Sequence, residues 1–470
     1  MLGWRWSLRL LGFISVIILA RLLTPEDYGV VAMATILTGL LGEITDFGVM
    51  QALINRTSLD NEHLNTGWTI QLIQRAVVSI LLVPVAHLGG IYFNDIRIIP
   101  VIYALAAASF ISGFGNIGIV YFQRELNFKK DFIYGVSQKV VSFVVTVAAG
   151  FILRNYWALV VGIIAERMTA LTMSYVMHPF RPRISLARFS QLWGFSQWML
   201  VSTSVRYCRD KADQFFVGGA LGSIQMGQYT VGFRLATLPT SEVIVPIGRA
   251  LFPNYSKIAH DQILLKDSFL KSISAMALLI PVVGIGLACV AQDAVPVILG
   301  EKWINITPIV QLLSLMGVVG GLMYLARPLL MALGDMKTVA NFELLHAIIV
   351  VPAAFLAAHY GTVVTVALSR LVSNIIMLPI IYSVTMRRVG IGLNEILSCF
   401  WRPSLSISVM ALILSYTDLT WIDSRVIKLL FEILLGGGAY LIMVLVLSMA
   451  FGYKDTVERE LLRRLLRRHS

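Results

Sequence analysis

The chain has 470 residues, of which 57% are hydrophobic and only 14% are charged. A soluble domain keeps about 25% charged residues because its surface must be hydrated, so this composition excludes a soluble globular protein. The formal net charge of +12 would suggest nucleic-acid binding in a soluble protein. In a membrane protein it is the expected excess of Lys and Arg in cytoplasmic loops, and we do not expect a nucleic-acid partner.

Apolar runs long enough to cross about 30 Å of hydrocarbon recur along the whole chain. The first follows Arg5 and Arg9 in the manner of a secretory signal, but no small-residue cleavage site leads into a soluble region, so we predict a retained helix. The chain is thus predicted to be an all-α integral membrane protein with about 14 transmembrane helices. The predicted spans are 4–20, 28–54, 67–93, 98–123, 132–153, 156–178, 194–221, 224–250, 270–292, 306–332, 338–358, 362–386, 400–417 and 426–451.

The distribution of Lys and Arg between alternating loops predicts the orientation. With the N-terminus inside, the inner segments carry 22 of these residues and the outer segments carry 6. This bias is the one that orients membrane proteins, and it predicts that both termini are cytoplasmic. The end of the chain, residues 453–470, is basic and carries a leucine stripe. It is typical of an amphipathic helix on the cytoplasmic leaflet, although a frayed basic end is nearly as good an interpretation.

A weak internal sequence similarity indicates a repeat. Residues 23–29 and 221–227 each lie between an odd-numbered span and the next one, 198 residues apart, and both begin with Leu and end with Gly. A parallel repeat of six helices would place both turns outside. We therefore expect two pseudo-symmetric six-helix lobes followed by two extra helices. The predicted divisions are 1–190 (N-terminal lobe), 191–398 (C-terminal lobe), 399–452 (helices 13 and 14) and 453–470 (basic amphipathic tail).

Ionisable residues inside the spans are the informative ones. Each charge at the bilayer centre costs about 2.5–3.5 kcal/mol on insertion scales, so these side chains should face the bundle interior or a watery cavity. The deep basic residues are Arg75, Lys139, Arg167, Arg206, Arg209, Lys211, Arg234, Arg327 and Arg370. The deep acidic residues are Glu43, Asp46, Glu166, Asp210, Asp213, Glu242 and Glu343.

The densest cluster lies in the seventh span. Arg206, Arg209, Asp210 and Asp213 share one helical face, and the spacing predicts the pairs Arg206–Asp210 and Arg209–Asp213. In the first lobe, Asp46 and Arg75 lie at similar depth and form a possible pair. That pair serves function or helix association equally well, whereas helix association is the better interpretation for Arg327 and Glu343.

Several cations in one cavity would suit an anionic ligand such as a lipid-linked pyrophosphate, which Arg can bind in a bidentate manner. The candidates for a substrate cavity are Arg75, Lys139, Arg206, Arg209, Arg234 and Arg370. Embedded carboxylates can carry a coupling proton because burial raises a carboxylate pKa. The candidates for that role are Glu43, Asp46 and Asp213.

Ordered motifs cover nearly the whole chain. They include ARLLTPEDYG at 20–29, DFG at 46–48, FQRELNFK at 122–129, WALVVG at 157–162, DQFFVGGALG at 213–222, GQYTVGFRLATLP at 227–239 and GEKW at 300–303. On these motifs the chain resembles the polysaccharide-transporter family of Wzx-type repeat-unit flippases. That family belongs to the superfamily that also contains the multidrug MATE exporters and the lipid II flippase.

The resemblance implies a flippase that moves undecaprenyl-diphosphate-linked oligosaccharide from the cytoplasmic to the periplasmic leaflet of a bacterial inner membrane by alternating access. The product would enter exopolysaccharide, capsule or lipopolysaccharide. Five residues of this chain occupy motif positions of the family: Arg21, Asp46, Arg124, Asp213 and Arg234. For Arg124, a role in structure or orientation alone is an open alternative. One departure is Gly219, which stands where an Arg is common.

The resemblance also implies the partners: the lipid-linked substrate, membrane lipids, and a polymerase or other polysaccharide-assembly proteins. The nearest alternative is an ion-coupled, MATE-like exporter of small amphipathic molecules, which should have a cavity dominated by acids. A polymerase or ligase would need a long outer loop with catalytic Arg or His, and the longest outer loop spans only residues 293–305. We therefore predict no enzyme activity, no cofactor and no metal site.

Overall fold

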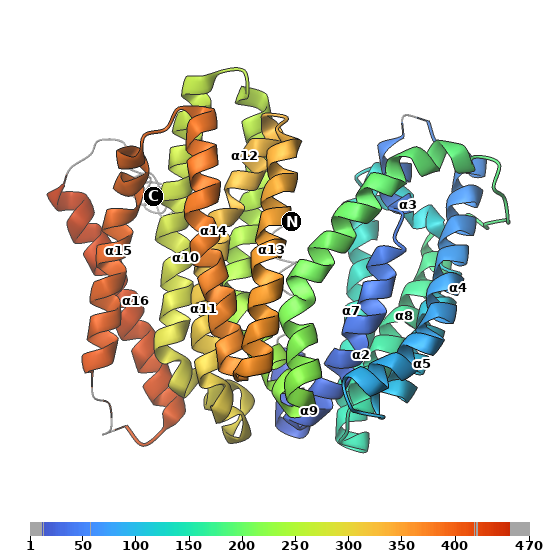
Figure 1. Cartoon of the computed structure of the whole chain (residues 1–470), viewed down its shortest axis with the longest axis horizontal. Coiled ribbons are helices and arrows are strands. Elements are labelled where there is room, and N and C mark those ends of the chain that lie inside the picture. The colour runs from blue at the N-terminus through green and yellow to red at the C-terminus, as the bar shows by residue number, and fades with distance from the viewer. Residues whose placement is uncertain (1–11, 13, 57, 418, 420–421, 452–470) are drawn as a thin grey trace. The chain divides into compact units, whose positions relative to one another are not determined.

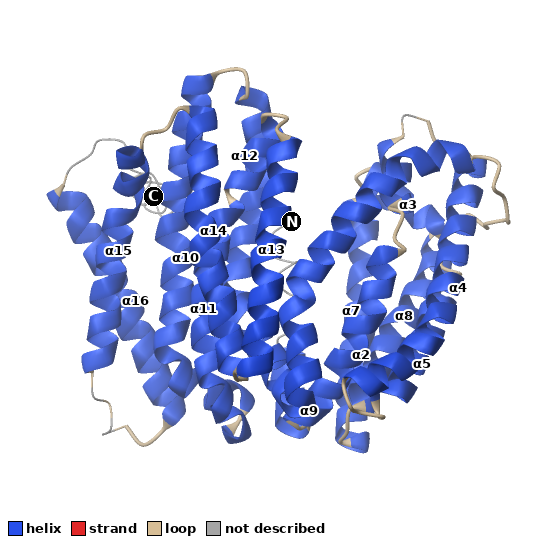
Figure 2. Ribbon diagram, viewed as in Figure 1, coloured by secondary structure: helices blue, strands red, loops and turns tan. Residues whose placement is uncertain are grey.

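The computed structural model describes residues 12, 14–56, 58–417, 419 and 422–451. Every element in these ranges is a helix, and short loops join the helices (Figures 1 and 2). The chain forms two compact units, residues 1–230 and 231–470. The boundary between these units falls inside a helix, and the predicted division into six-helix lobes stays a prediction.

The described residues of the first unit form seven α-helices, one 3₁₀ helix and the start of a long eighth α-helix. Within it, α4 packs on α5, α5 on α8, and α7 on α8. Its elements are α2 (Pro25–Ile44), α3 (Val49–Asn55), α4 (Asn61–Tyr92), α5 (Ile98–Ser112), η1 (Ile117–Ile119), α6 (Val120–Arg124), α7 (Phe128–Leu153), α8 (Trp157–Met177) and the beginning of α9 (Phe189–Ile258).

The second unit is built around α10, which packs against α11, α15 and α16, while α14 packs against α11 and α13. Large apolar side chains such as Phe269 and Tyr255 are fully buried in its core. Besides the end of α9, its elements are α10 (Gln262–Leu299), η2 (Glu301–Ile306), α11 (Thr307–Tyr324), α12 (Ala326–Ala332), α13 (Met336–Tyr360), α14 (Val363–Val389), α15 (Leu393–Tyr416) and α16 (Arg425–Ala450).

Helices of transmembrane length confirm a multi-pass membrane protein. In the described part of the chain, 10 helices are long and apolar enough to cross a membrane, or 11 if the bent pair α5–α6 is one span. Of the other three predicted spans, 4–20 lies mostly outside the described residues, and 194–221 and 224–250 both lie in the less apolar α9. The count of 14 stays a prediction.

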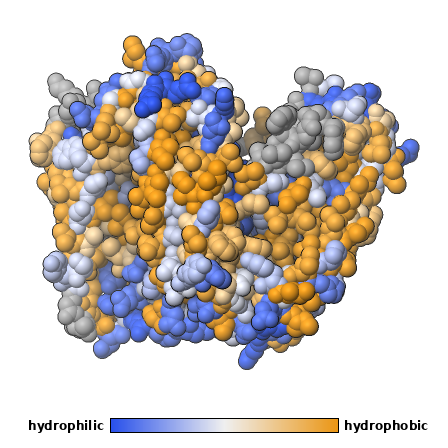
Figure 3. Space-filling view, viewed as in Figure 1, coloured by the Kyte–Doolittle hydropathy of each residue, from blue (hydrophilic) through white to orange (hydrophobic). Residues whose placement is uncertain are grey.

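The outer surface is that of a protein in lipid. Large apolar side chains stand exposed along the helices, for example Ile152 at 79% and Leu434 at 73%. On the visible face of each unit, hydrophobic residues dominate the middle and hydrophilic residues gather toward the ends (Figure 3). Water would make such a surface a liability, whereas hydrocarbon makes it the expected one.

Two predicted spans are broken inside the first unit. The run 28–54 is interrupted between α2 and α3, where Gly48 N donates to Asp46 Oδ1 at 2.9 Å. The run 98–123 bends by 73° between α5 and the η1–α6 segment, where Gly118 N donates to Asn116 Oδ1 at 2.9 Å. Short polar side chains thus satisfy the backbone groups that each break frees.

The two similar segments, 23–29 and 221–227, contact each other. The chain leaves helical geometry at Gly222, with φ 85° and ψ −178°, which is where a turn was predicted. A Cβ added at Gly29 would lie 1.8 Å from Ser223 O, and one at Gly227 would lie 1.7 Å from Pro25 O. Pro25 and Ser223 occupy equivalent positions in the two segments, and so do Gly29 and Gly227. The contact is therefore reciprocal, as expected when two like segments pair around a two-fold axis.

The connector between α8 and α9, residues 178–188, is bound to the first turns of α4. Arg183 N donates to Asn65 Oδ1 at 2.9 Å, Ser185 N to Thr69 Oγ1 at 3.0 Å, and Arg188 N to Thr66 Oγ1 at 3.2 Å. The three α4 side chains, Asn65, Thr66 and Thr69, are all buried. These buried polar groups are satisfied by the connector backbone, so the connector belongs structurally to the first unit.

Candidate functional site

Charged side chains from three segments gather in the first unit around Arg75 of α4. This guanidinium lies within electrostatic reach of Glu43 near the end of α2, Asp46 in the α2–α3 break, and Arg167 of α8. The stem of Arg75 packs beside Gly113, where an added Cβ would lie 2.9 Å from Arg75 Cβ. The break between α2 and α3 therefore brings two carboxylates toward two arginines from other helices.

The expected Arg75–Asp46 ion pair does not form. Among the described residues, neither Arg75 nor Arg167 makes an ion pair, although both lie near carboxylates. Asp46 instead accepts from the backbone of Gly48. Two neighbouring cations without a bonded carboxylate are costly in a membrane, and an anionic ligand would lower that cost.

Lys139 of α7 is paired, unlike these arginines. Its Nζ lies 2.7 Å from Glu166 Oε1 of α8, next to Arg167 in the chain. Tyr134, one turn earlier on α7, lies within electrostatic reach of Arg167 and accepts a hydrogen bond from Gln138 through its backbone oxygen at 2.9 Å. Among the described residues, the α7–α8 face thus carries the Lys139–Glu166 ion pair next to Arg167, which forms none.

Of the two pairs predicted within α9, Arg206–Asp210 is not formed among the described residues, and Arg209–Asp213 stays a prediction. Arg209 Nε and Nη2 lie 2.9 and 2.8 Å from Oδ1 of the adjacent residue, Asp210. Arg206 is exposed and makes no ion pair with a described carboxylate.

Asp213 is fully buried, and it is the one carboxylate classed as buried among the described residues. Tyr229 Oη donates to Asp213 Oδ2 at 2.7 Å, and Gln214 N donates to Asp213 Oδ1 at 2.8 Å. Tyr229 follows the turn at Gly222, so its hydroxyl returns to the carboxylate 16 residues earlier.

Two more cavity candidates lie in the second unit. Arg234 is exposed on α9, whereas Arg370 is buried in α14 at 8% exposure. One turn from Arg370, Asn374 Oδ1 lies 3.1 Å from His346 Nε2 of α13. Arg75 belongs to the first unit and these two arginines to the second, and one cavity that contains them all stays a prediction.

The pairing of Arg327 with Glu343 is present. Their side chains lie 3.6 Å apart and link α12 to α13. This is consistent with the expected role in helix association.

The first family motif mainly builds a helix start. Thr24 and Asp27 form a capping box, with Thr24 N donating to Asp27 Oδ2 at 2.9 Å and Asp27 N donating to Thr24 Oγ1 at 3.2 Å. Asp27 Oδ1 also accepts from Tyr156 N at 2.9 Å, and Glu26 pairs with Arg97 at 2.6 Å. Arg21 itself is exposed.

Arg124 acts at the end of α3. Its Nη1 donates to Leu53 O at 3.2 Å, a carbonyl in the last turn of that short helix, where a cation is favourable. This contact supports the structural alternative for Arg124. Gly219, which stands where an Arg is common, has its space filled by the Tyr92 ring, 2.5 Å from where a Cβ would lie.

Sequence reasoning counted Arg167 among the deep charges but did not select it. The sequence does not show that Arg167 lies near Arg75, because that proximity depends on the packing of α4 and α8. Tyr229 and Tyr134 were missed for the same reason.

Comparisons with known proteins agree with this fold and these motifs. Residues 18–308 match the family model described as polysaccharide biosynthesis protein. The chain is 24% identical to the lipopolysaccharide biosynthesis protein WzxC of Escherichia coli (strain K12), over 86% of this chain and 83% of that protein. It is 24% identical to the succinoglycan biosynthesis transport protein ExoT of Rhizobium meliloti (strain 1021), over 97% and 91% of the two chains.

Among solved structures, the chain is similar to the lipid II flippase MurJ in an inward closed conformation. The TM-score is 0.76 at 12% identity, covering 95% of this chain and 98% of that one. At this identity the likeness concerns the fold alone, which is a multi-span helical membrane fold. Because the family model covers more than half of the sequence, the chain belongs to the polysaccharide biosynthesis protein family.

Proposed function

We propose that this protein is a flippase that carries a lipid-linked oligosaccharide from the cytoplasmic to the outer leaflet of a bacterial cytoplasmic membrane. Membership in the polysaccharide biosynthesis protein family, together with the similarity to WzxC, to the transport protein ExoT and to the lipid II flippase MurJ, supports transport of such lipids. The observation that carries the proposal is the proximity of Arg75 and Arg167 without an ion pair in the described part of the chain.

The chemistry of the substrate fits this arrangement. A lipid diphosphate carries two or more negative charges, and each guanidinium can hold phosphate oxygens with two parallel hydrogen bonds. The nearby Glu43 and Asp46 leave the group less positive than the arginines alone, which favours release after binding. Lys139, Arg206, Arg209, Arg234 and Arg370 stay proposed cavity residues of lower rank, because Lys139 and Arg209 are already paired.

The coupling ion is proposed to be a proton held by a membrane carboxylate. Asp213 is the leading candidate because it is fully buried and accepts a hydrogen bond from the Tyr229 hydroxyl. That hydroxyl can reorient when the carboxylate takes up a proton. Glu43 and Asp46 are the alternatives. An Asp213→Asn variant that still transports at the wild-type rate, and still stops when the proton gradient is collapsed, would exclude Asp213 from this role.

The orientation with both termini cytoplasmic, and assembly with a polymerase or other polysaccharide-assembly proteins, are part of the same proposal. The excess of Lys and Arg in the inner segments supports the orientation.

The test compares Arg75→Gln and Arg167→Gln with Lys257→Gln, an exposed lysine of the second unit. Loss of a charge-assisted phosphate contact should weaken binding of undecaprenyl diphosphate to the purified protein by about tenfold to a hundredfold. Surface polysaccharide should fall in cells while protein abundance is maintained. An exporter of small amphipathic cations would keep its activity in both Arg variants. Normal polymer output and unchanged lipid binding would refute the proposal.

A further inference from the structure

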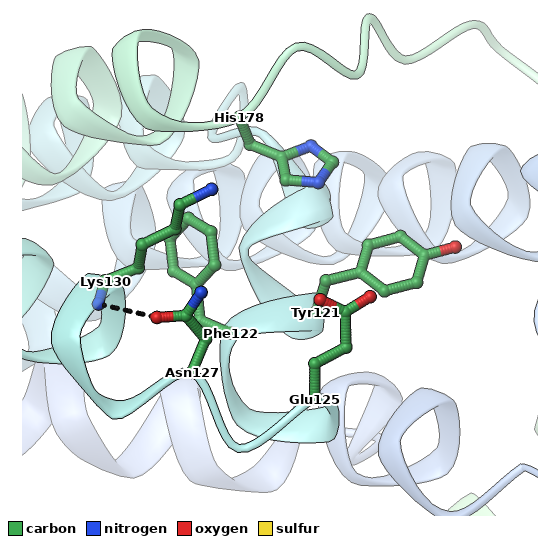
Figure 4. A pocket seen from close by; sticks show the side chains of 6 residues that line it. All are labelled: Tyr121, Phe122, Glu125, Asn127, Lys130 and His178. Carbon is green, nitrogen blue, oxygen red and sulfur yellow. Dashed lines mark hydrogen bonds between the residues drawn. The ribbon is translucent and has the colours of Figure 1, made fainter.

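A small pocket lies where α6 turns into α7, on the side of the first unit that the Lys and Arg count predicts to be cytoplasmic. Its volume is about 180 Å³, below the roughly 300–1,000 Å³ of sites that take a drug-sized ligand. It can therefore accept one small group and not a whole oligosaccharide. Six side chains line it: Tyr121, Phe122, Glu125, Asn127, Lys130 and His178 (Figure 4).

The histidine wall of this pocket is held in place. His178 stacks in parallel on Tyr121, with ring centroids 5.6 Å apart and an interplanar angle of 11°. Its ring lies over Gly118, where an added Cβ would be 2.2 Å from His178 Nδ1. Asn116 Nδ2 donates to the carbonyls of His178 and Phe180 at 3.1 and 2.7 Å. The ring is therefore positioned before any ligand arrives.

A further hydrogen bond shows which ring nitrogen of His178 carries the proton. Phe180 N donates to His178 Nδ1 at 3.2 Å, so Nδ1 is an acceptor and Nε2 carries the hydrogen. Burial, together with the Lys130 and Arg181 cations, lowers the pKa of His178 despite Glu125. At neutral pH the ring is thus an uncharged donor.

Polar groups of both kinds remain available around the space. In the described part of the chain, the Glu125 carboxylate, the Lys130 ammonium and the Tyr121 hydroxyl have no hydrogen-bond or ion-pair partner. Lys130 Nζ lies over the Phe122 ring, 5.7 Å from its centroid. Asn127 uses its Oδ1 to accept from Lys130 N at 3.2 Å (Figure 4), which leaves its amide hydrogens as donors. Opposite charges thus line one pocket without bonding to each other.

This mixture selects the ligand class. A free phosphate would face the Glu125 carboxylate, and a cation would face the Lys130 ammonium. A sugar ring carries hydroxyls that both donate and accept, so it can donate to Glu125 and accept from Lys130 and His178 Nε2. Its apolar face can lie against the aromatic side chains.

We propose that this pocket is a loading site that binds one sugar ring of the lipid-linked oligosaccharide at the cytoplasmic side. The inference rests on the proposed flippase function and adds the sugar to what is recognised. The diphosphate would be read at Arg75 and Arg167, and the sugar at Glu125 and Lys130.

Two probes separate these roles: undecaprenyl diphosphate, and the lipid-linked oligosaccharide extracted from cells that lack this protein. Affinity of the purified protein for each is measured by native mass spectrometry in lipid nanodiscs. Glu125→Ala and Lys130→Gln should each weaken binding of the sugar-bearing lipid by about tenfold, the loss of one charge-assisted hydrogen bond. Binding of undecaprenyl diphosphate should not change.

Lys129→Gln is the matched control, since Lys129 is exposed in the same motif but does not line the pocket. Glu125→Gln keeps the shape of the side chain and checks that Glu125→Ala has not altered the turn. If the pocket variants bind the sugar-bearing lipid as Lys129→Gln does, or lose both lipids equally, the loading site is refuted. If the wild-type protein binds neither lipid, the proposed function itself fails.

Discussion

Replacing Gly227 with alanine tests the reciprocal contact between the starts of α2 and the second part of α9. A Cβ there would lie 1.7 Å from Pro25 O, and the atom it meets is backbone, so no flexible side chain can yield. To open the contact to even 3.0 Å, the two segments must separate by about 1.3 Å. Closely packed interiors resist such shifts, and we expect a loss of about 3 kcal/mol, the upper end of the usual overpacking cost.

The assay is thermal unfolding of the purified protein in detergent, followed by the fraction that stays monodisperse. Gly437→Ala is the control, because nothing lies within 4 Å of a Cβ at that position of α16. Both substitutions gain up to about 1 kcal/mol of helix propensity, so their difference isolates the clash. Should Gly227→Ala unfold at the same temperature as Gly437→Ala, or above it, the reciprocal contact would not be the close approach described here.

Three further perturbations follow from the described contacts. Tyr229→Phe leaves Asp213 without its hydroxyl donor and should cost about 1–3 kcal/mol of stability, read as a lower unfolding temperature. A double-mutant cycle on Lys139 and Glu166, which are half-exposed, should give a coupling below about 1 kcal/mol. Hydrogen bonds from the backbone N–H and ring of His63 hold the pKa of Asp60, the N-cap of α4, below its ordinary 3.8. The Asp60 cap is therefore complete above pH 3.8 and is lost as the pH falls through the lowered pKa. Amide hydrogen exchange in the first turn of α4 can follow this loss.

Each of these has its own control. Tyr92→Phe, at an exposed tyrosine, should be neutral, and an equal loss there would mean that the Tyr229 effect is not specific. A coupling above about 3 kcal/mol would place the Lys139 pair in a far drier setting than its exposure indicates. An Asp60→Asn variant should show no change of exchange across that acidic range, once the intrinsic rate is corrected. Identical profiles for the variant and the wild type would refute the role of the carboxylate.

The sequence was sufficient for the class of fold because long apolar runs have few alternatives in lipid. It also located the turn at Gly222, since a break between two spans needs residues that leave helical geometry. It could not reveal the interruptions of 28–54 and 98–123, because each broken segment remains apolar on both sides of the break. Hydropathy measures composition over a window and is insensitive to one Asp or Asn that accepts a backbone hydrogen bond.

The site was predictable in its residue types and not in its partners. Insertion cost selected Asp213, which is fully buried, but it also selected Arg206 and Arg234, which are exposed. Helical spacing did not predict the contact of Arg209 with Asp210, since a flexible guanidinium can also reach the adjacent residue. The donor to Asp213 comes from beyond a turn, and Arg167 comes from another helix. Both depend on packing that no local pattern encodes.

The hydrogen bonds of the connector also constrain how this gene can change. Loops usually absorb insertions and deletions because their backbone faces water. Here Arg183, Ser185 and Arg188 each need a specific side chain of α4, so one extra residue among them would move every later N–H out of register. We expect this stretch to keep a constant length among close relatives, and to reject inserted reporter tags that an ordinary surface loop would tolerate.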